Sequence, residues 1–290
     1  MEQTKNKVFI NGILAETDIK YSDYTNAQGT RVEAISGSVT ILVETDKGNC
    51  QVPVRIYANK LKGDGTPNKL YLEFEKVKNE MVSIAAAGSK AGATKVRVSG
   101  ASIQENAFYA ESGQLVSTPV IRANFITEDT QNSNPQAFFD VDFVVENIAP
   151  VVDRDGIEVS PTILKVRAGL IGYGDKVNFV DFLAKDPAVV NGVSNWEVGS
   201  LQNMRGNIEF SSVEVQKLVN TGFEEVLKTF TNTTREFVIN GTVPVEADYG
   251  FSPVAYNRTK EVRLTALENS KNKRQKAAPS PGASMNNFGF

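Results

Sequence analysis

The sequence contains no histidine. Because imidazole is the usual general base at neutral pH and the commonest metal ligand, this absence excludes serine and cysteine triads, zinc hydrolases and histidine relays. The chain also lacks a phosphate loop of the GxxxxGK[ST] form and a carboxylate cluster with metal-site spacing. We therefore expect a protein that is not an enzyme, without catalytic residues, cofactors or metal ligands.

Cysteine and long apolar runs are scarce as well. The single cysteine, Cys50, can form neither an intramolecular disulfide nor a multi-thiolate metal site, and is expected to be buried in a strand. No window reaches the roughly 18 apolar residues of a membrane-spanning helix, and residues 1–7 (MEQTKNK) contain no apolar stretch of signal-peptide type. These features predict a cytoplasmic protein with no membrane partner.

Short segments that alternate or run apolar between turns predict a β-rich fold. In the first half of the chain, the predicted strands cover residues 7–14, 34–44, 50–58, 95–104 and 115–126. One helix is predicted after the third of these strands, with Asn68 as its N-cap. It is indicated by apolar residues at intervals of four and three, the spacing of one helical face: Leu70, Phe74, Val77, Met81 and Ile84.

The same order of elements recurs after a polar linker at residues 128–135. The predicted strands of the second half cover residues 138–148, 162–171, 176–184, 201–210 and 234–243. A short helix is predicted to begin at Asp186 and Pro187, with Trp196 as a core anchor beneath it. The last two strands are separated by a long polar segment that we interpret as an extended hairpin.

Three strands, a helix and two strands is the element order of the oligonucleotide/oligosaccharide-binding (OB) barrel. The 290 residues also exceed the usual size of one hydrophobic core. We therefore predict a mainly β protein with two tandem five-stranded OB-type Greek-key barrels, each with a helix between strands 3 and 4. The predicted barrel domains are residues 1–128 and 129–250, and residues 251–290 are predicted to be a charged, helix-compatible segment and a flexible tail.

Several short motifs resemble single-stranded-DNA-binding proteins, in particular phage-encoded and Gram-positive relatives with two barrels in one chain. KVRVSG at residues 95–100, NAFY at 106–109 and GQLVS at 113–117 are similar to that family's fourth strand, hairpin and fifth strand. WEVGSL at 196–201 and MRGNI at 204–208 resemble the same strand entry in the second barrel. The resemblance implies a protein that coats single-stranded DNA during replication, recombination or repair, in a bacterial cell or a phage-infected host.

The C-terminus adds to this resemblance. Bacterial members of that family end in a flexible linker and a phenylalanine that recruits replication and repair proteins, which implies a partner-binding role here for Phe288 and Phe290. The present chain departs from that pattern, because the acidic residues before the terminal aromatic are missing. Its nearest charges are basic: Lys271, Lys273, Arg274 and Lys276.

Single-strand binding requires cations that follow the phosphates and flat aromatic faces on which bases stack. If Val52, Val54 and Ile56 point into the first barrel, period-two alternation places Arg55 and Tyr57 outside. The same alternation exposes Lys95 and Arg97, and Lys165 and Arg167. Tyr21, Tyr24 and Arg31 are expected in the loop after the first strand, and Phe108 and Tyr109 in the hairpin between the fourth and fifth strands. With these five, the candidate nucleic-acid-binding residues are the strand residues Arg55, Tyr57, Lys95, Arg97, Arg122, Lys165 and Arg167.

The net charge of −3 and the pI near 5.3 exclude a strongly basic, duplex-coating protein but not a local cationic stripe. Three alternatives stay open. The chain could be a β-rich virion component of a tail or baseplate, or an RNA-binding protein of the same fold. A carboxylate-dependent nuclease or glycosidase would use Asp140 and Asp142, which we expect instead on the solvent face of a strand.

Overall fold

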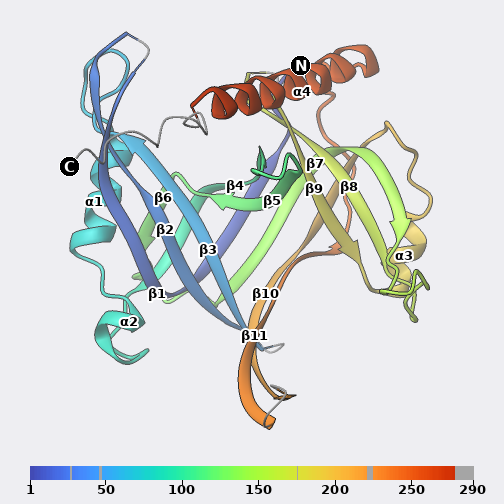
Figure 1. The fold of residues 1–290 in the computed structure, drawn as a ribbon, viewed down its shortest axis with the longest axis horizontal. Helices are drawn as coiled ribbons and strands as arrows, with labels where there is room; N and C mark the ends of the chain where they lie inside the picture. Colours follow the sequence, from blue (N-terminus) through green and yellow to red (C-terminus); the bar gives the residue numbers. More distant parts are fainter. Residues whose placement is uncertain (27, 46–47, 175, 221–224, 278–290) are drawn as a thin grey trace, which may run out of the picture.

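A computed structural model describes residues 1–26, 28–45, 48–174, 176–220 and 225–277 of the chain. Its strands are β1 (Asn6–Thr25), β2 (Arg31–Thr45), β3 (Gly48–Asn59), β4 (Lys95–Tyr109), β5 (Leu115–Arg122), β6 (Phe125–Glu128), β7 (Gln136–Pro150), β8 (Leu164–Gly172), β9 (Lys176–Ala184), β10 (Leu201–Asn220) and β11 (Glu225–Gly241). The helices are α1 (Lys69–Asn79), α2 (Ile84–Ala87), α3 (Pro187–Val193) and α4 (Pro253–Ala277). The predicted mainly β class is therefore confirmed (Figure 1).

Strands β1 to β5 close into a ring, which we call the first ring. β2 pairs antiparallel with β1 and β3, β4 pairs antiparallel with β1 and β5, and β3 pairs parallel with β5. This is the strand order of a five-stranded Greek-key barrel, with α1 between its third and fourth strands. The first ring therefore has the element order that the sequence predicts.

Strands β7 to β11 close a second ring with the same connectivity. β8 pairs with β7 and β9, β10 pairs with β7 and β11, and β9 runs parallel to β11. Tightly packed aromatic rings fill its interior, where Phe139 lies 5.1 Å from Phe182 and 6.0 Å from Phe237 between ring centroids. Helix α3 lies between the third and fourth strands, and the Asp186 carboxylate caps it by accepting from the Ala188 amide at 2.8 Å.

The two rings share one continuous sheet. β1 pairs with β4 on one edge and with β7 on the other, so that Val8 lies opposite both Ala101 and Phe139. The buried apolar residues of both rings form one connected core cluster. The seam between β1 and β7 thus holds the two halves closely together. The predicted division into domains at residues 128 and 250 stays a prediction.

Helix α1 packs its apolar face against the first ring. Asn68 caps it as predicted by accepting from the Leu70 amide at 3.1 Å, and Phe74 and Val77 are fully buried. The predicted helical face is too long, however, because α1 ends at Asn79. Met81 and Ile84 lie beyond its end, where Ser83 caps the short helix α2 by accepting from the Ala86 amide.

Two loop and strand predictions for the first half are wrong. Tyr21, Tyr24 and Arg31 belong to strands rather than a loop, because the β1–β2 ladder continues through the pair Thr25 and Arg31. The Tyr and Thr residues of this segment favour the extended backbone of a strand. The predicted strand at 115–126 is split into β5 and β6, since its partner β4 is irregular at Gly100, whose φ is +60°.

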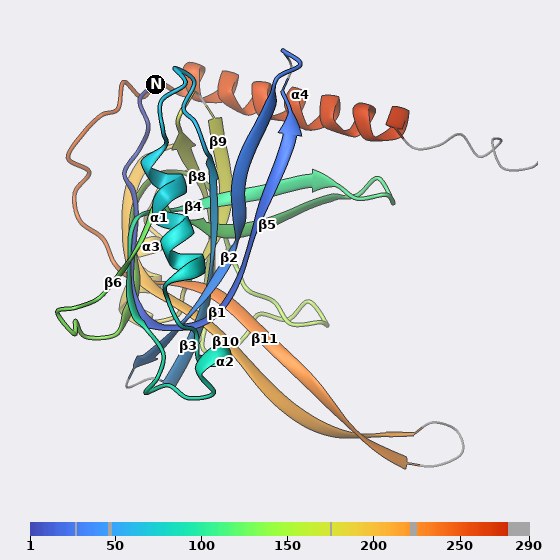
Figure 2. The ribbon, with the colours of Figure 1, turned by 90° about the vertical axis from the view of Figure 1, so that its left-hand side faces the viewer.

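The predicted extended hairpin is present as β10 and β11. Both strands leave the second ring and continue as a paired arm that projects from the body (Figure 2). Helix α4 runs along the opposite end of the molecule, above β8 and β9 in both views (Figures 1 and 2). In the described part of the chain, no helix has both the length and the apolar character to cross a membrane. The predicted tail residues Phe288 and Phe290 lie outside the described residues.

Candidate nucleic-acid interface

A groove of about 640 Å³ crosses the outer face of the first ring and reaches the base of the β10–β11 arm. Its floor is formed by β2, β3 and β5, and its far wall by Phe210 and Arg235 of the second ring. A smaller hollow of about 110 Å³ shares Pro53, Phe210 and Arg235 with it and continues along the arm. We call these two hollows together the central groove.

The alternation of β3 places two predicted residues on the floor of this groove. Val52, Val54 and Ile56 are buried in the core, as expected, so Arg55 and Tyr57 face outward. Arg55 lies opposite Arg122 in the parallel pairing of β3 with β5. Sequence reasoning therefore identified the two cations of the first ring that line this groove.

Strand β2 contributes only small residues to the groove. Gly37 lies on its wall, and a Cβ atom there would lie only 2.0 Å from the Asp18 carbonyl oxygen. Ser36 and Ser38 on either side are small. The neighbouring strand can therefore approach closely, and no large side chain of β2 fills the space above Arg55.

The arginines of the groove have no acidic partner among the described residues. Among the described residues, no hydrogen bond or ion pair reaches the guanidinium groups of Arg55, Arg122 or Arg235. Asp18, the acidic residue on the groove wall, is paired with Lys20 at 3.0 Å. The groove therefore presents three positive charges that are available for an anionic ligand.

Two tyrosines form an aromatic shelf at one end of the groove. The Tyr57 and Tyr24 hydroxyls both donate to the Asn59 Oδ1 atom, at 2.7 and 3.4 Å, and both side chains are 43% exposed. Desolvation and the adjacent Tyr24 hydroxyl raise the pKa of Tyr57 to about 12, against the opposing charge of Arg122. Tyr57 is therefore a neutral ring at physiological pH and does not repel phosphate.

Asn59 and Arg235 are the residues of this site that sequence reasoning missed. Asn59 is the last residue of β3, two positions after Tyr57. Its side-chain oxygen accepts hydrogen bonds from both Tyr24 and Tyr57. Arg235 has the same parity as the buried residues Phe237 and Ile239, so alternation would place it in the core. Arg235 is exposed because β11 has left the ring at that point and become part of the arm. The only signal for this would have been that β11 begins at Glu225, well before the predicted strand start at residue 234.

The other predicted residues of the β1–β2 hairpin do not join the groove. Tyr21 lies on the opposite face of β1 from Tyr24, where the Lys78 ammonium stands 5.5 Å above its ring. Arg31 is bonded to Asp23, with its Nε atom 2.6 Å from Oδ2. Of these three residues, none lines the central groove, and only Tyr24 lies beside Tyr57 at its end, through the shared contact with Asn59.

The predicted cations of β4 are held by the connection between the two rings. Arg97 contacts the Asp129 carboxylate at 3.2 Å, and Asp129 is itself almost fully buried. Lys95 donates to the Asn132 side chain at 2.8 Å. Burial acts to raise the pKa of Asp129, but hydrogen bonds from Ser133 and the charge of Arg97 outweigh it and lower that pKa. These cations therefore have a structural role.

The β4–β5 hairpin and the second ring carry the remaining predicted residues. Phe108 and Tyr109 pair with Val116 and Leu115 in the hairpin, and the Lys271 ammonium lies 4.8 Å from the Tyr109 ring. In the second ring, Lys165 and Arg167 are exposed on β8 as alternation predicts. None of these four lines the central groove.

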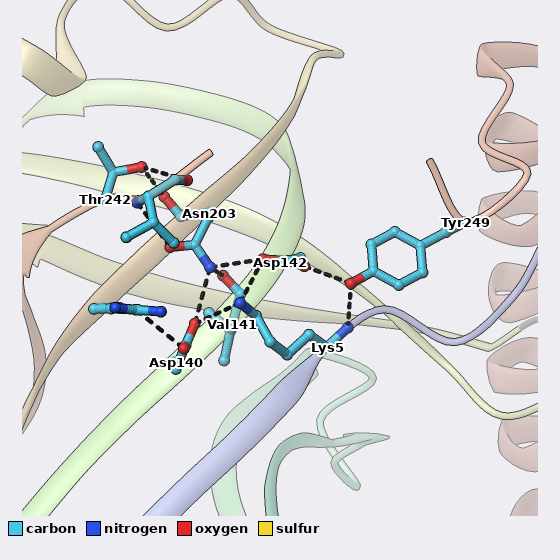
Figure 3. Close-up of polar contacts among 9 residues, drawn as sticks. Lys5, Asp140, Val141, Asp142, Asn203, Thr242 and Tyr249 are labelled. Carbon is cyan, nitrogen blue, oxygen red and sulfur yellow. Dashed lines mark hydrogen bonds and ion pairs between the residues drawn. The ribbon is translucent and has the colours of Figure 1, made fainter. Parts of the chain in front are cut away.

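The predicted acidic pair on β7 is mostly buried rather than solvent-facing, which corrects the expectation for Asp142. Its side chain is 2% exposed, and Tyr249 donates to its Oδ2 atom at 2.5 Å (Figure 3). Asn203 bridges the two carboxylates, at 2.9 Å from Asp140 and 2.6 Å from Asp142. The chain's first residues and the 242–249 segment cover this part of β7, which is why it is not a solvent face.

Two cations complete this network and neutralise the acids. The Lys5 ammonium lies 3.0 Å from Asp140 and 3.5 Å from Asp142 (Figure 3). Arg205 Nε lies 3.0 Å from Asp140. Burial acts to raise the pKa of Asp140, but hydrogen bonds from Asn203 and Lys5 prevail and lower it. Among the described residues, no group of three or more acidic, cysteine or histidine side chains could hold a metal ion. Both carboxylates are therefore paired with cations of the chain itself.

Cys50 is buried in β3, as expected, and its thiol joins the two rings. The Sγ atom accepts from the Phe210 amide and donates to the Ile208 carbonyl, both at 3.2 Å. Burial raises the pKa of this thiol. Cys50 therefore holds the base of the arm, including Phe210, against the first ring.

The fold and the groove define a mainly β protein with two five-stranded rings and a groove lined by arginines and Tyr57 on the outer face of the first ring. The YorF family profile matches residues 5–273, and the chain belongs to the YorF family. No curated protein matches the sequence significantly.

Two solved structures are similar to this chain at low identity. One is a deletion mutant of the single-stranded DNA binding protein from Thermus aquaticus, with 14% identity over 87% of this chain and 98% of that one, and a TM-score of 0.47. The other is a replication protein A heterotrimer bound to ssDNA, with 11% identity over 80% and 49% of the respective chains and a TM-score of 0.24. At these values the similarity supports no functional inference, and function is inferred from the groove itself.

We predict that replacing Asp140 with Asn destabilises the protein at neutral pH. Removing a partly buried charge with several hydrogen bonds should cost about 1–3 kcal/mol of unfolding free energy. Because the folded-state pKa lies below the ordinary value of 3.8, the carboxylate stabilises the fold above that value and loses its effect as the pH falls. The difference between the proteins should therefore shrink on acidification, as measured by urea unfolding at a series of pH values.

Asp181→Asn is the matched control, since Asp181 forms an exposed pair with Arg167. Its effect should be under about 0.5 kcal/mol. Equal destabilisation by both variants, or a loss for Asp140→Asn that grows on acidification, would contradict the assignment.

Proposed function

We propose that this protein binds single-stranded DNA in the central groove and coats it during replication or recombination. The observation that carries this proposal is the combination of three unpartnered arginines with an exposed tyrosine shelf in one continuous hollow. Cations that follow the phosphates and aromatic faces that stack on bases are the two requirements of single-strand binding. The chain supplies both on the outer face of a five-stranded ring.

The arrangement favours unpaired over paired bases. Tyr24 and Tyr57 present their rings at the surface, and stacking on them requires a base whose face is free. The groove lacks a long cationic helix that could enter the major groove of a duplex. Affinity for a single strand should therefore depend on stacking as well as on charge, whereas a duplex could use the charge alone.

The acidic composition of the chain is compatible with this proposal. The net charge is −3, but the acids that form ion pairs do so with cations outside the groove, such as Asp129 with Arg97. Short-range binding depends on the local charge, and a negative surface elsewhere opposes nonspecific association. The three arginines therefore act as a local anion site on an acidic protein.

We expect Arg55→Ala and Arg122→Ala to weaken binding of oligothymidine and to make it less salt-dependent. Each lost phosphate contact should reduce the slope of log K against log salt by about 0.7, the value for single strands. Fluorescence anisotropy at a series of salt concentrations measures both quantities. Arg154→Ala is the control, because Arg154 is an exposed arginine outside the groove, and a slope change as large as that of Arg55→Ala would argue against the proposal.

Two variants of Tyr57 test whether bases stack on the tyrosine shelf. Tyr57→Ala should lose about 1–3 kcal/mol of binding free energy with the stacking surface, whereas Tyr57→Phe keeps the ring and should bind nearly as well as the native protein. Quenching of tyrosine fluorescence on addition of oligothymidine gives the affinities, and parallel titrations with RNA and duplex DNA give the selectivity. Equal affinity for single strand and duplex, or a harmless Tyr57→Ala, would be inconsistent with base stacking.

A further inference from the structure

The two rings have the same connectivity, but part of the outer face of the second ring is covered where the first ring has its groove. On β3 of the first ring, Tyr57 is 43% exposed and Arg55 has no partner among the described residues. If both rings bound DNA in the same way, the corresponding face of β8 and β9 in the second ring would be equally accessible. In the structure, part of that face is buried instead.

Helix α4 and the segment before it cover that face. Ile171 is 1% exposed and Val177 4%, although both point away from the interior of the second ring. Together with Val144 and Tyr256, they form a small core of their own, separate from the main one. Near the turn that joins β8 and β9, their outer face is thus an apolar packing surface for this part of the chain.

Tyr256 of α4 packs directly against a glycine of β8. A Cβ atom at Gly169 of β8 would lie 1.8 Å from the Tyr256 hydroxyl oxygen, so only glycine admits the ring there. Tyr256 is 3% exposed, and burial raises its pKa. No space is left for a base to stack at this position of the second ring.

The charges of this face are also engaged within the protein. Arg167 contacts Asp181 at 3.3 Å, and the guanidinium groups of Arg167 and Arg263 lie 5.2 and 4.8 Å from the Phe179 ring. The aromatic face that a base could use is therefore occupied by arginine side chains. At the far end of β9, Lys185 lies 2.5 Å from Glu236.

Ion pairs hold α4 in place across both rings. Arg263 contacts Glu105 of β4 through two bonds of 2.5 and 3.0 Å, and these two side chains are only 12% and 3% exposed. Lys260 contacts both carboxylate oxygens of Glu146 at 3.2 Å. The helix is thus an integral part of the fold rather than a surface appendage.

The second ring instead contributes to the groove of the first. Phe210 and Arg235 lie opposite each other at the base of the β10–β11 arm and form the far wall of the central groove. Arg235 has no acidic partner among the described residues, as is true of Arg55. Its position extends the positive charge of the first ring toward the arm.

We infer that each chain binds one single strand, in a groove that combines the outer face of the first ring with Arg235 of the second, while α4 covers part of the outer face of the second ring. This inference rests on the proposed function. The repeated topology alone would instead suggest two equivalent binding sites per chain, one on each ring.

The test is a titration of the full chain with oligothymidine of about six nucleotides, within the roughly 4–16 nucleotides that one barrel of this type covers. At protein concentrations well above the dissociation constant, calorimetry or fluorescence quenching should give one oligonucleotide per chain. Two per chain would overturn the inference while leaving single-strand binding intact. Absence of any binding by the native protein would instead refute the proposed function and the inference with it.

Matched variants identify the groove directly. Arg235→Ala should lower the salt slope by about 0.7, as expected for one phosphate contact. Lys165→Ala removes an exposed cation from the outer face of β8 and should leave the slope and the stoichiometry unchanged. A reduced slope for Lys165→Ala together with an unchanged slope for Arg235→Ala would overturn the inference, and circular dichroism confirms that each variant is folded.

Discussion

The antiparallel pairing of β1 with β7 is the contact on which the rest of the structure depends. β1 closes the first ring through β4 on one edge and joins the second ring through β7 on the other, so neither edge is free. This seam fixes the position of one ring relative to the other. It therefore also places β3 against the base of the arm. Without that placement, Arg235 would not lie beside the arginines of the first ring, and the central groove would lose its far wall.

Polar contacts reinforce the seam where apolar packing ends. Asn203 links Asp140 and Asp142 of β7, and Lys5 adds a charge from the segment that leads into β1. The Cys50 thiol bonds to the backbone of β10 on the other side of the rings. These groups lie among their partners, so they specify the relative position of the two rings in addition to stabilising it.

Much of the fold follows from local patterns in the sequence. Alternation in β3 correctly placed Arg55 and Tyr57 outside, and the caps Asn68 and Asp186 marked the starts of α1 and α3. Alternation is reliable there because the strand stays in the ring, with one face on the core.

Other features depend on tertiary contacts that no local pattern contains. Arg235 follows the parity of core residues and is exposed only because β11 leaves the ring. Asp142 lies on a face that distant segments cover, and the β1–β2 ladder extends past the expected end of the first strand to include Tyr24. The open face of the first ring and the covered face of the second differ through α4, which lies far along the chain from the strands it packs on.

Photo-crosslinking of oligothymidine to the full chain, with the modified peptides located by mass spectrometry, tests the central claim most directly. If the groove between the rings holds the single strand, crosslinks should map to Tyr57, Tyr24 and the peptide around Phe210 and Arg235. Crosslinks confined to β8, β9 and the α4 surface, with none on β3, would contradict the account.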